Sequence, residues 1–109
     1  MQMDLLTVKA LKHAKICGHL NSMYQRKNAD YNDAFAKSFA KRGLSQTVMR
    51  LEDKINRLSA LSENTAQVAD ESVEDTLMDI ANYAIMTLIE LGVVGDEDID
   101  IRCEKAEQK

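Results

Sequence analysis

The sequence lacks proline and tryptophan, and only four of its 109 residues are glycine and five are phenylalanine or tyrosine. Without proline no residue obliges a helix to break, and the many Ala, Leu, Met, Glu, Lys and Gln residues favour the α-helix. Hydrophobic residues make up 45% of the chain and charged residues 29%, which excludes a disordered or collagen-like chain. The length allows one small domain, which we expect over residues 1–95, with residues 96–109 as an acidic tail or short C-terminal helix.

Basic residues, cysteines and long apolar runs are also scarce. The chain has 14 Lys and Arg against 18 Asp and Glu, a formal net charge of −4, so we expect no duplex nucleic acid as a partner. Its two cysteines, Cys17 and Cys103, form no metal-binding pattern, and we expect both to be reduced thiols. We see no signal peptide and no run approaching the ~18–20 apolar residues of a membrane span, which predicts a cytoplasmic protein without membrane contact.

The chain does contain a succession of helical segments. We predict helices over residues 4–27, 33–42, 45–61 and about 70–91, with a turn over residues 28–33 and a connector over 62–69. The residue types suited to begin or end these helices are Asp4, Ser45 and either Asp70 or Ser72 as N-caps, and Gly43 and Gly92 as terminators. Three long helices and one short helix predict an all-α bundle.

The last predicted helix carries a stripe of acids. On a helical wheel its apolar residues share a face that we predict to be the core: Val73, Leu77, Ile80, Ala84, Leu88 and Leu91. The opposite face carries Glu71, Asp75, Asp79 and Asn82. Residues 84–89 are apolar nearly all round, so we expect the polar face to enter a covered region. Covered carboxylates need compensation, either from Lys and Arg side chains of a neighbouring helix or from a divalent cation.

The third predicted helix offers a matching set. Asp53 lies beside its predicted core face of Val48, Leu51, Ile55 and Leu58, with Lys54 and Arg57 close by. Carboxylates on adjacent turns suit Mg²⁺, with Mn²⁺ as the alternative ion, and Lys and Arg can neutralise phosphate. We therefore hypothesise a metal site of Asp53, Glu71, Asp75 and Asp79, assisted by Glu52 or Glu74 as ligand or water-orienting base. We expect the ligand itself to contact Lys54, Arg57, Tyr31 and Asn82. The alternative is an ordinary solvated acidic face, because the helix macrodipole favours acids in a first turn.

Three runs of the sequence carry a resemblance. KNADYNDAF (27–35), RLEDKINRL (50–58) and DESVEDTLMDIANYAIM (70–86) together resemble the nucleotide modification associated domain family of phages and bacteria. That family resembles the all-α nucleoside triphosphate pyrophosphatases, the MazG-like and dimeric dUTPase-like enzymes. In those enzymes an E-x-x-E pair and an E-x-x-D pair hold Mg²⁺. In this chain Thr76 stands where an E-x-x-D ending at Asp79 would begin, and the acids Asp75 and Asp79 are four residues apart instead.

The resemblance implies a nucleotide ligand and a reaction. We expect nucleotide-phosphate binding and Mg²⁺-dependent hydrolysis of a (deoxy)nucleoside triphosphate to monophosphate and pyrophosphate, in nucleotide metabolism or DNA modification (in the host cytoplasm for a phage-encoded chain). Two alternatives stay open: a non-catalytic protein that binds or sequesters a nucleotide or nucleotide signal, and a structural bundle whose acids are neutralised by basic residues. In each case we expect a homodimer or higher homo-oligomer, because one layer of helices cannot cover residues 84–89.

Overall fold

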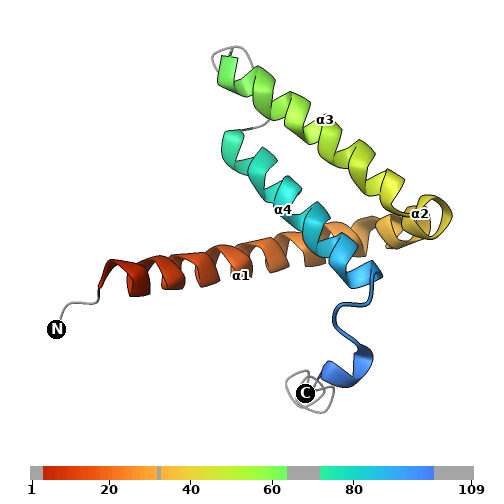
Figure 1. Ribbon diagram of the computed structural model, residues 1–109, viewed down its shortest axis with the longest axis horizontal. Coiled ribbons are helices and arrows are strands. Elements are labelled where there is room, and N and C mark those ends of the chain that lie inside the picture. The colour runs from red at the N-terminus through yellow and green to blue at the C-terminus, as the bar shows by residue number, and fades with distance from the viewer. Residues whose placement is uncertain (1–3, 32, 64–71, 100–109) are drawn as a thin grey trace.

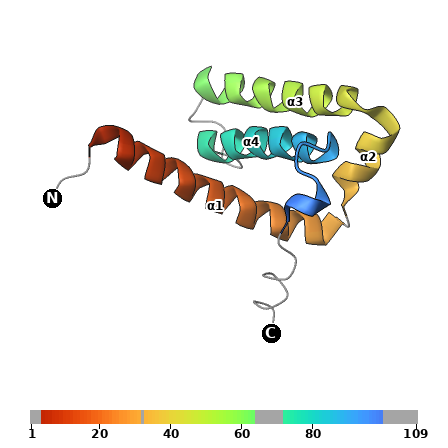
Figure 2. The ribbon, with the colours of Figure 1, turned by 60° about the horizontal axis from the view of Figure 1, so that its bottom comes forward.

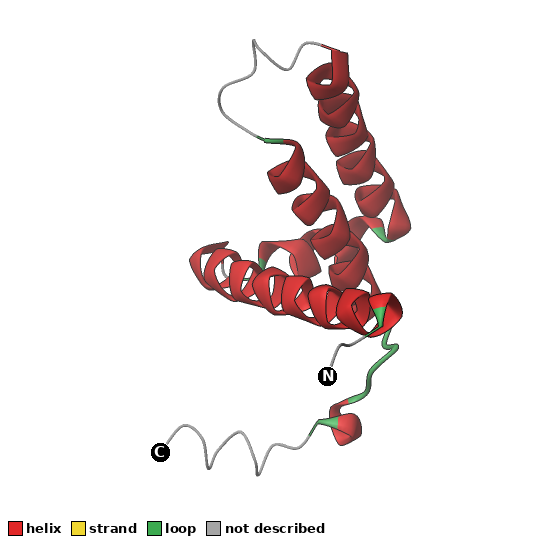
Figure 3. Cartoon of the chain, turned by 90° about the vertical axis from the view of Figure 1, so that its left-hand side faces the viewer, coloured by secondary structure: helices red, strands yellow, loops and turns green. Residues whose placement is uncertain are grey.

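The computed structural model describes residues 4–31, 33–63 and 72–99. Its elements are α1 (Leu5–Tyr31), α2 (Ala34–Arg42), α3 (Leu44–Glu63), α4 (Val73–Glu90) and a short 3₁₀ turn, η2 (Asp96–Asp98). Every regular element in these ranges is helical, as Figure 3 shows. The predicted all-α architecture of three long helices and one short helix is therefore confirmed.

The helices form an open arrangement around α4. Helices α3 and α4 run antiparallel and side by side, α2 leads from the end of α1 into α3, and the C-terminal half of α1 crosses beneath α4 (Figure 1). Figure 2 shows that the N-terminal half of α1 projects beyond the other helices. The Cα radius of gyration is 17.0 Å, whereas a compact chain of this length has about 13 Å. None of the helices in the described ranges is long and apolar enough to cross a membrane.

Two predicted N-caps are present and one is wrong. The Asp4 carboxylate accepts a hydrogen bond from the Thr7 N–H at 2.8 Å, and the Ser72 hydroxyl accepts one from the Asp75 N–H at 3.0 Å. Ser45 does not cap, because α3 already begins at Leu44, directly after Gly43 (φ 62°). The Ser45 hydroxyl instead donates to the Arg42 carbonyl at 2.7 Å.

The predicted turn over residues 28–33 is wrong in its extent. Helix α1 continues through Tyr31, four residues beyond the predicted end, and the chain reverses close to Asp33. Asp33 has a left-handed backbone (φ 57°), a conformation that aspartate tolerates better than most residues. The extension brings Asn28 into the helix instead of a turn and places Lys27 one turn before the end of α1.

The predicted core faces are also wrong for this chain. Among the described residues the buried apolar side chains are Leu20, Phe35 and Leu61, whereas about half of each of Val48, Ile55, Leu77 and Leu88 is exposed. The contact between α3 and α4 includes a polar pair near one end, where the buried hydroxyls of Thr47, in the first turn of α3, and Thr87, in the last turn of α4, lie 2.8 Å apart. A helical period shows which residues share a face, but it does not show which face the rest of the chain covers. Here the polar face of α4, with Asp79 and Asn82, turns inward.

Candidate functional site

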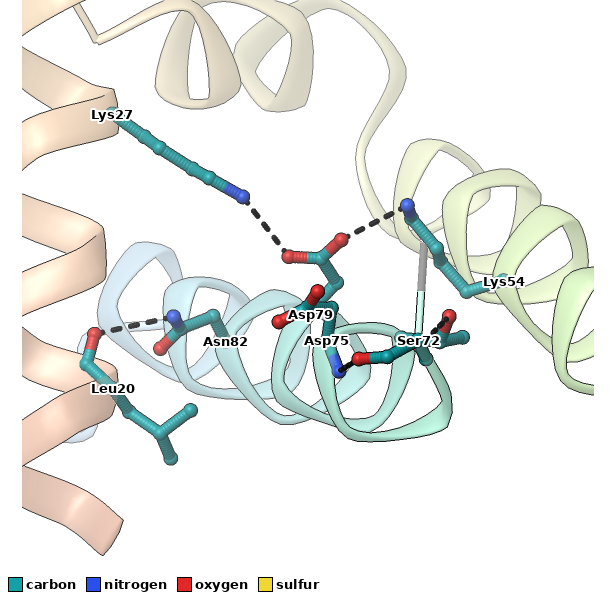
Figure 4. A network of polar contacts seen from close by, with 8 residues as sticks. Leu20, Lys27, Lys54, Ser72, Asp75, Asp79 and Asn82 are labelled. Atoms are coloured by element: carbon teal, nitrogen blue, oxygen red, sulfur yellow. Dashed lines mark hydrogen bonds and ion pairs between the residues drawn. The ribbon is translucent and has the colours of Figure 1, made fainter. Parts of the chain in front are cut away.

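Two lysines from different helices hold one carboxylate of α4. The Lys27 ammonium on α1 lies 3.0 Å from Oδ1 of Asp79, and the Lys54 ammonium on α3 lies 2.9 Å from Oδ2 (Figure 4). The side chains of Asp79 and Lys54 are 15% and 14% exposed, whereas that of Lys27 is 58% exposed. This Lys27–Asp79–Lys54 bridge joins three helices through one acid.

The bridge keeps Asp79 ionised. Burial alone would raise the pKa of its carboxyl, but the hydrogen bonds and positive charges of Lys54 and Lys27 lower it, and the balance lies below the ordinary value of 3.8. Asp79 is therefore a carboxylate at neutral pH with one ammonium on each oxygen. Of the two kinds of compensation expected for a covered acid, the structure provides the basic side chains.

A pocket of about 430 Å³ opens beside the bridge. Its walls come from all four helices, and its charged members are Lys27, Arg50, Lys54 and Asp79. The remaining lining residues are aromatic, apolar or carry amides: Tyr24, Asn28, Ala34, Phe35, Asn82, Tyr83 and Met86. We call this the basic pocket, because its lining cations outnumber its carboxylate.

The aromatic side of the basic pocket is a stacked column. The ring of Phe35 lies 6.3 Å from that of Tyr83 at an interplanar angle of 17°, and 6.3 Å from that of Phe39 at 16°. The guanidinium of Arg50 lies over the Tyr83 ring, 5.7 Å from its centre. Such a cation–π contact orients a guanidinium while leaving its N–H groups available for an anion. Phe35 is buried.

The amides and the second tyrosine fix the remaining wall. Asn82 is buried, and its side-chain N–H donates to the Leu20 carbonyl at 3.2 Å, which ties α4 to α1 (Figure 4). Asn28 donates to the Tyr24 hydroxyl at 3.3 Å. Burial raises the pKa of the Tyr24 phenol, and the nearby charges of Asp33 and Glu90 raise it further. The phenol therefore stays protonated and can both donate and accept hydrogen bonds.

The structure does not bring the four hypothesised metal ligands together in its described part. Asp79 lies in the bridge, whereas Asp53 is exposed, 3.8 Å from the Arg57 guanidinium, and lines a second pocket of about 330 Å³. Asp75 is exposed at the start of α4, and Glu71 lies outside the described residues. Within residues 4–31, 33–63 and 72–99, no three His, Cys, Asp or Glu side chains are grouped so that they could hold a metal ion.

The other predicted site residues divide in the same way. Of the residues predicted to contact a ligand, Lys54 and Asn82 line the basic pocket and Arg57 does not. Glu52 and Glu74 are exposed and line neither of the two pockets. Tyr31 is the last residue of α1, and its side chain lies outside the description.

Sequence reasoning missed Lys27 and Arg50 as site residues. Each is the first basic residue of a run that carries the resemblance, 27–35 for Lys27 and 50–58 for Arg50. The third run, 70–86, supplies Asp79, Asn82, Tyr83 and Met86. All lining residues of the basic pocket except Tyr24 fall in the three runs. Membership in these runs is therefore the sequence signal that could have identified Lys27 and Arg50.

These features define a class: a small all-α protein with a basic, aromatic-walled pocket. Its family is also clear, because the family described as Nucleotide modification associated domain 1 matches residues 27–91, more than half of the chain, and the chain belongs to it. The match begins at Lys27 and contains every lining residue of the basic pocket except Tyr24. No curated protein and no solved structure matches the chain.

Proposed function

We propose that the chain binds the phosphate of a nucleotide in the basic pocket. The observation that carries this proposal is that Lys27, Arg50 and Lys54 line one pocket, where the two lysines hold the mostly buried Asp79 carboxylate and Arg50 lies over the Tyr83 ring. Charge-assisted hydrogen bonds from Lys and Arg are the usual protein ligands of phosphate. The description of the family, which associates it with nucleotide modification, supports a nucleotide over other phosphorylated ligands.

The pocket suggests how such a ligand would lie. The phosphate contacts Lys27 and Arg50 at the charged side, and the base lies toward the apolar side formed by Tyr24, Tyr83 and Met86. Aromatic contacts to a base contribute roughly 1–3 kcal/mol per base in nucleic-acid systems. In this role Asp79 does not touch the ligand. It is a positioning residue that holds the two lysines in place.

A thermal-shift screen of nucleotides tests the proposal. Free ligand at 100 times its Kd stabilises a protein by about 2.7 kcal/mol, which gives a clear shift in Tm. We expect at least one nucleotide to raise Tm, and Arg50→Gln to remove most of that shift. The matched control is Lys15→Gln, since Lys15 is exposed on α1 and lines neither pocket. A screen in which no nucleotide shifts Tm would refute the proposal and favour a structural bundle.

A second candidate is Mg²⁺-dependent hydrolysis of a nucleoside triphosphate, as in the MazG-like enzymes that the chain resembles. One observation favours it: Asp75 lies one helical turn before Asp79, and Figure 4 shows both carboxylates on the same side of α4. An Mg²⁺ or Mn²⁺ ion there would lie beside the ammonium groups of Lys27 and Lys54. Pyrophosphate release from a triphosphate in the presence of Mg²⁺ would support hydrolysis, and its absence with retained binding would leave a non-catalytic nucleotide-binding protein.

We further propose that the chain forms a homodimer or a larger homo-oligomer. The support is the apolar surface that the described chain leaves exposed on α3 and α4, with Val48, Ile55, Leu77 and Leu88 each about half exposed. Soluble monomers rarely expose large contiguous apolar patches, and a second copy of the same helix pair would complete a bundle. Light scattering that reports a monomer at micromolar concentration would contradict this proposal.

A further inference from the structure

Both oxygens of Asp79 already have an ammonium partner. Its Oδ1 accepts from Lys27 and its Oδ2 from Lys54, so a divalent cation at this carboxylate would lie beside two positive charges that repel it. The basic pocket has no second carboxylate among its lining residues. Asp75, one helical turn before Asp79, is exposed and does not line the basic pocket, and Asp53 is exposed and lines the second pocket instead.

The cations of the pocket are placed for an anion rather than for a metal complex. Lys27 is more than half exposed, and its ammonium has three N–H donors, one of which points to Asp79. Among the described residues, Arg50 forms a cation–π contact with the Tyr83 ring and no ion pair with a carboxylate. Its guanidinium can therefore offer a pair of parallel N–H groups to phosphate oxygens.

The charge of the phosphate group selects among nucleotides. A triphosphate carries about four negative charges and usually enters proteins with Mg²⁺, which bridges the phosphates and carboxylates. A monophosphate carries about −1.5 to −2 at neutral pH and needs no metal. A pocket of about 430 Å³ also lies toward the small end of ligand sites, which span roughly 300–1,000 Å³.

From this geometry we infer that the ligand class of the basic pocket is a nucleoside monophosphate, bound without a divalent cation through Lys27 and Arg50, with Asp79 positioning Lys27. This inference rests on the proposed nucleotide function and specifies its ligand. It contrasts with the hydrolytic candidate, in which the ligand is a metal-bound triphosphate and Asp79 is itself a metal ligand.

Titration calorimetry on the full chain can test the inference. The probes are the four deoxynucleoside 5′-monophosphates and the four triphosphates, each with EDTA and with millimolar Mg²⁺. We expect a monophosphate to bind in EDTA with an affinity that Mg²⁺ leaves unchanged, and to bind more tightly than its triphosphate. We expect Lys27→Gln to weaken this binding roughly 10- to 100-fold, about 1.4–2.7 kcal/mol, and Lys15→Gln on the same helix to leave it unchanged.

Asp79→Asn separates the two roles of the acid. If Asp79 positions Lys27, the folded variant still binds the monophosphate in EDTA, and its affinity falls by no more than that of Lys27→Gln, because Lys27 itself remains and a negative charge near the phosphate is lost. Circular dichroism on the same samples shows whether the variant is folded, and the Lys27→Gln comparison decides the question where it is not. Abolished binding by a folded Asp79→Asn would overturn the positioning role.

The remaining outcomes distinguish a failure of this inference from a failure of the proposed nucleotide-binding function. If a triphosphate binds only with Mg²⁺ and no monophosphate binds, the nucleotide site stands and the inference is wrong. If no nucleotide binds under any condition, the proposed function itself fails. A 5′-phosphorylated oligonucleotide that binds more tightly than the mononucleotide would assign the phosphate to nucleic acid and would also overturn the inference.

Discussion

Replacing Asp79 by asparagine should destabilise the fold by a predictable amount. The Lys54–Asp79 contact is mostly buried at both ends, and hydrogen bonds to charged groups of this kind contribute about 1.5–3 kcal/mol. The Lys27–Asp79 contact is more than half exposed at the lysine, which limits it to about 1 kcal/mol or less. Because asparagine keeps one acceptor, we expect the free energy of unfolding to fall by roughly 2–3 kcal/mol.

The effect of Asp79 should also depend on pH with a definite sign. Its pKa in the folded chain lies below the ordinary value of 3.8, so the carboxylate contributes its full stabilisation above that pH. The contribution is lost as the pH falls through the lowered folded pKa. The stability difference between wild type and Asp79→Asn should therefore be largest at neutral pH and should shrink below about pH 4.

Urea unfolding followed by circular dichroism measures this difference, at one fixed protein concentration because assembly changes apparent stability. Lys27→Met should cost no more than about 1 kcal/mol and Lys54→Met more than that. The control is Asp53→Asn, an exposed carboxylate whose pairing with Arg57 at 3.8 Å predicts a change of no more than about 0.5 kcal/mol. An Asp79→Asn variant as stable as wild type at pH 7, or a difference that does not change with pH, would refute the bridge as a stabilising element.

Three further outcomes can be measured with the same unfolding assay and with light scattering. Thr47→Val should cost about 1–3 kcal/mol, because it removes the buried hydroxyl that lies 2.8 Å from that of Thr87, and adding Thr87→Val should cost less than the sum of the two single changes. Ser72→Ala should lower stability by about 0.5–2 kcal/mol through loss of the N-cap bond to Asp75, whereas Ser72→Asp should restore most of it. Leu88→Glu should give monomers at concentrations where the wild type is assembled, and a wild type that is already monomeric would contradict this expectation.

The sequence was sufficient for the helices but not for their packing. Helix existence and most ends follow from local chemistry, which is why Asp4, Ser72 and Gly43 act as predicted. The end of α1 could not be predicted in this way, because Asn and Asp residues over 28–33 favour turns yet the helix persists through Tyr31. The core faces failed for a different reason. Amphipathic period is a property of one helix, whereas burial depends on what lies against it.

Several residues of the site could be predicted from the sequence, but the way in which they come together could not. Asp79 and Asn82 were identified because polar residues in a covered region require partners, and Lys54 because lysine can neutralise phosphate. All three line the basic pocket. The partner of Asp79 was left open between metal and basic side chains, and Lys27 is 52 residues away in the sequence. Only the crossing of α1 beneath α4 brings its ammonium to Asp79, and no local pattern encodes a helix crossing.

The net charge of −4 and the basic pocket are compatible because electrostatics in salt water is local. At physiological ionic strength the screening length is about 8 Å, so acids exposed elsewhere, such as those of η2, act weakly on the pocket. Lys27 on α1 and Arg50 and Lys54 on α3 line one pocket only in the folded chain, where both helices contact α4. The carboxylate of Asp79 offsets part of the repulsion among these three cations, and it accepts from one N–H of each lysine. The acid whose compensation the sequence left open between a metal and basic side chains has two lysine partners, and under the proposed function it lets several cations share one pocket for an anionic ligand.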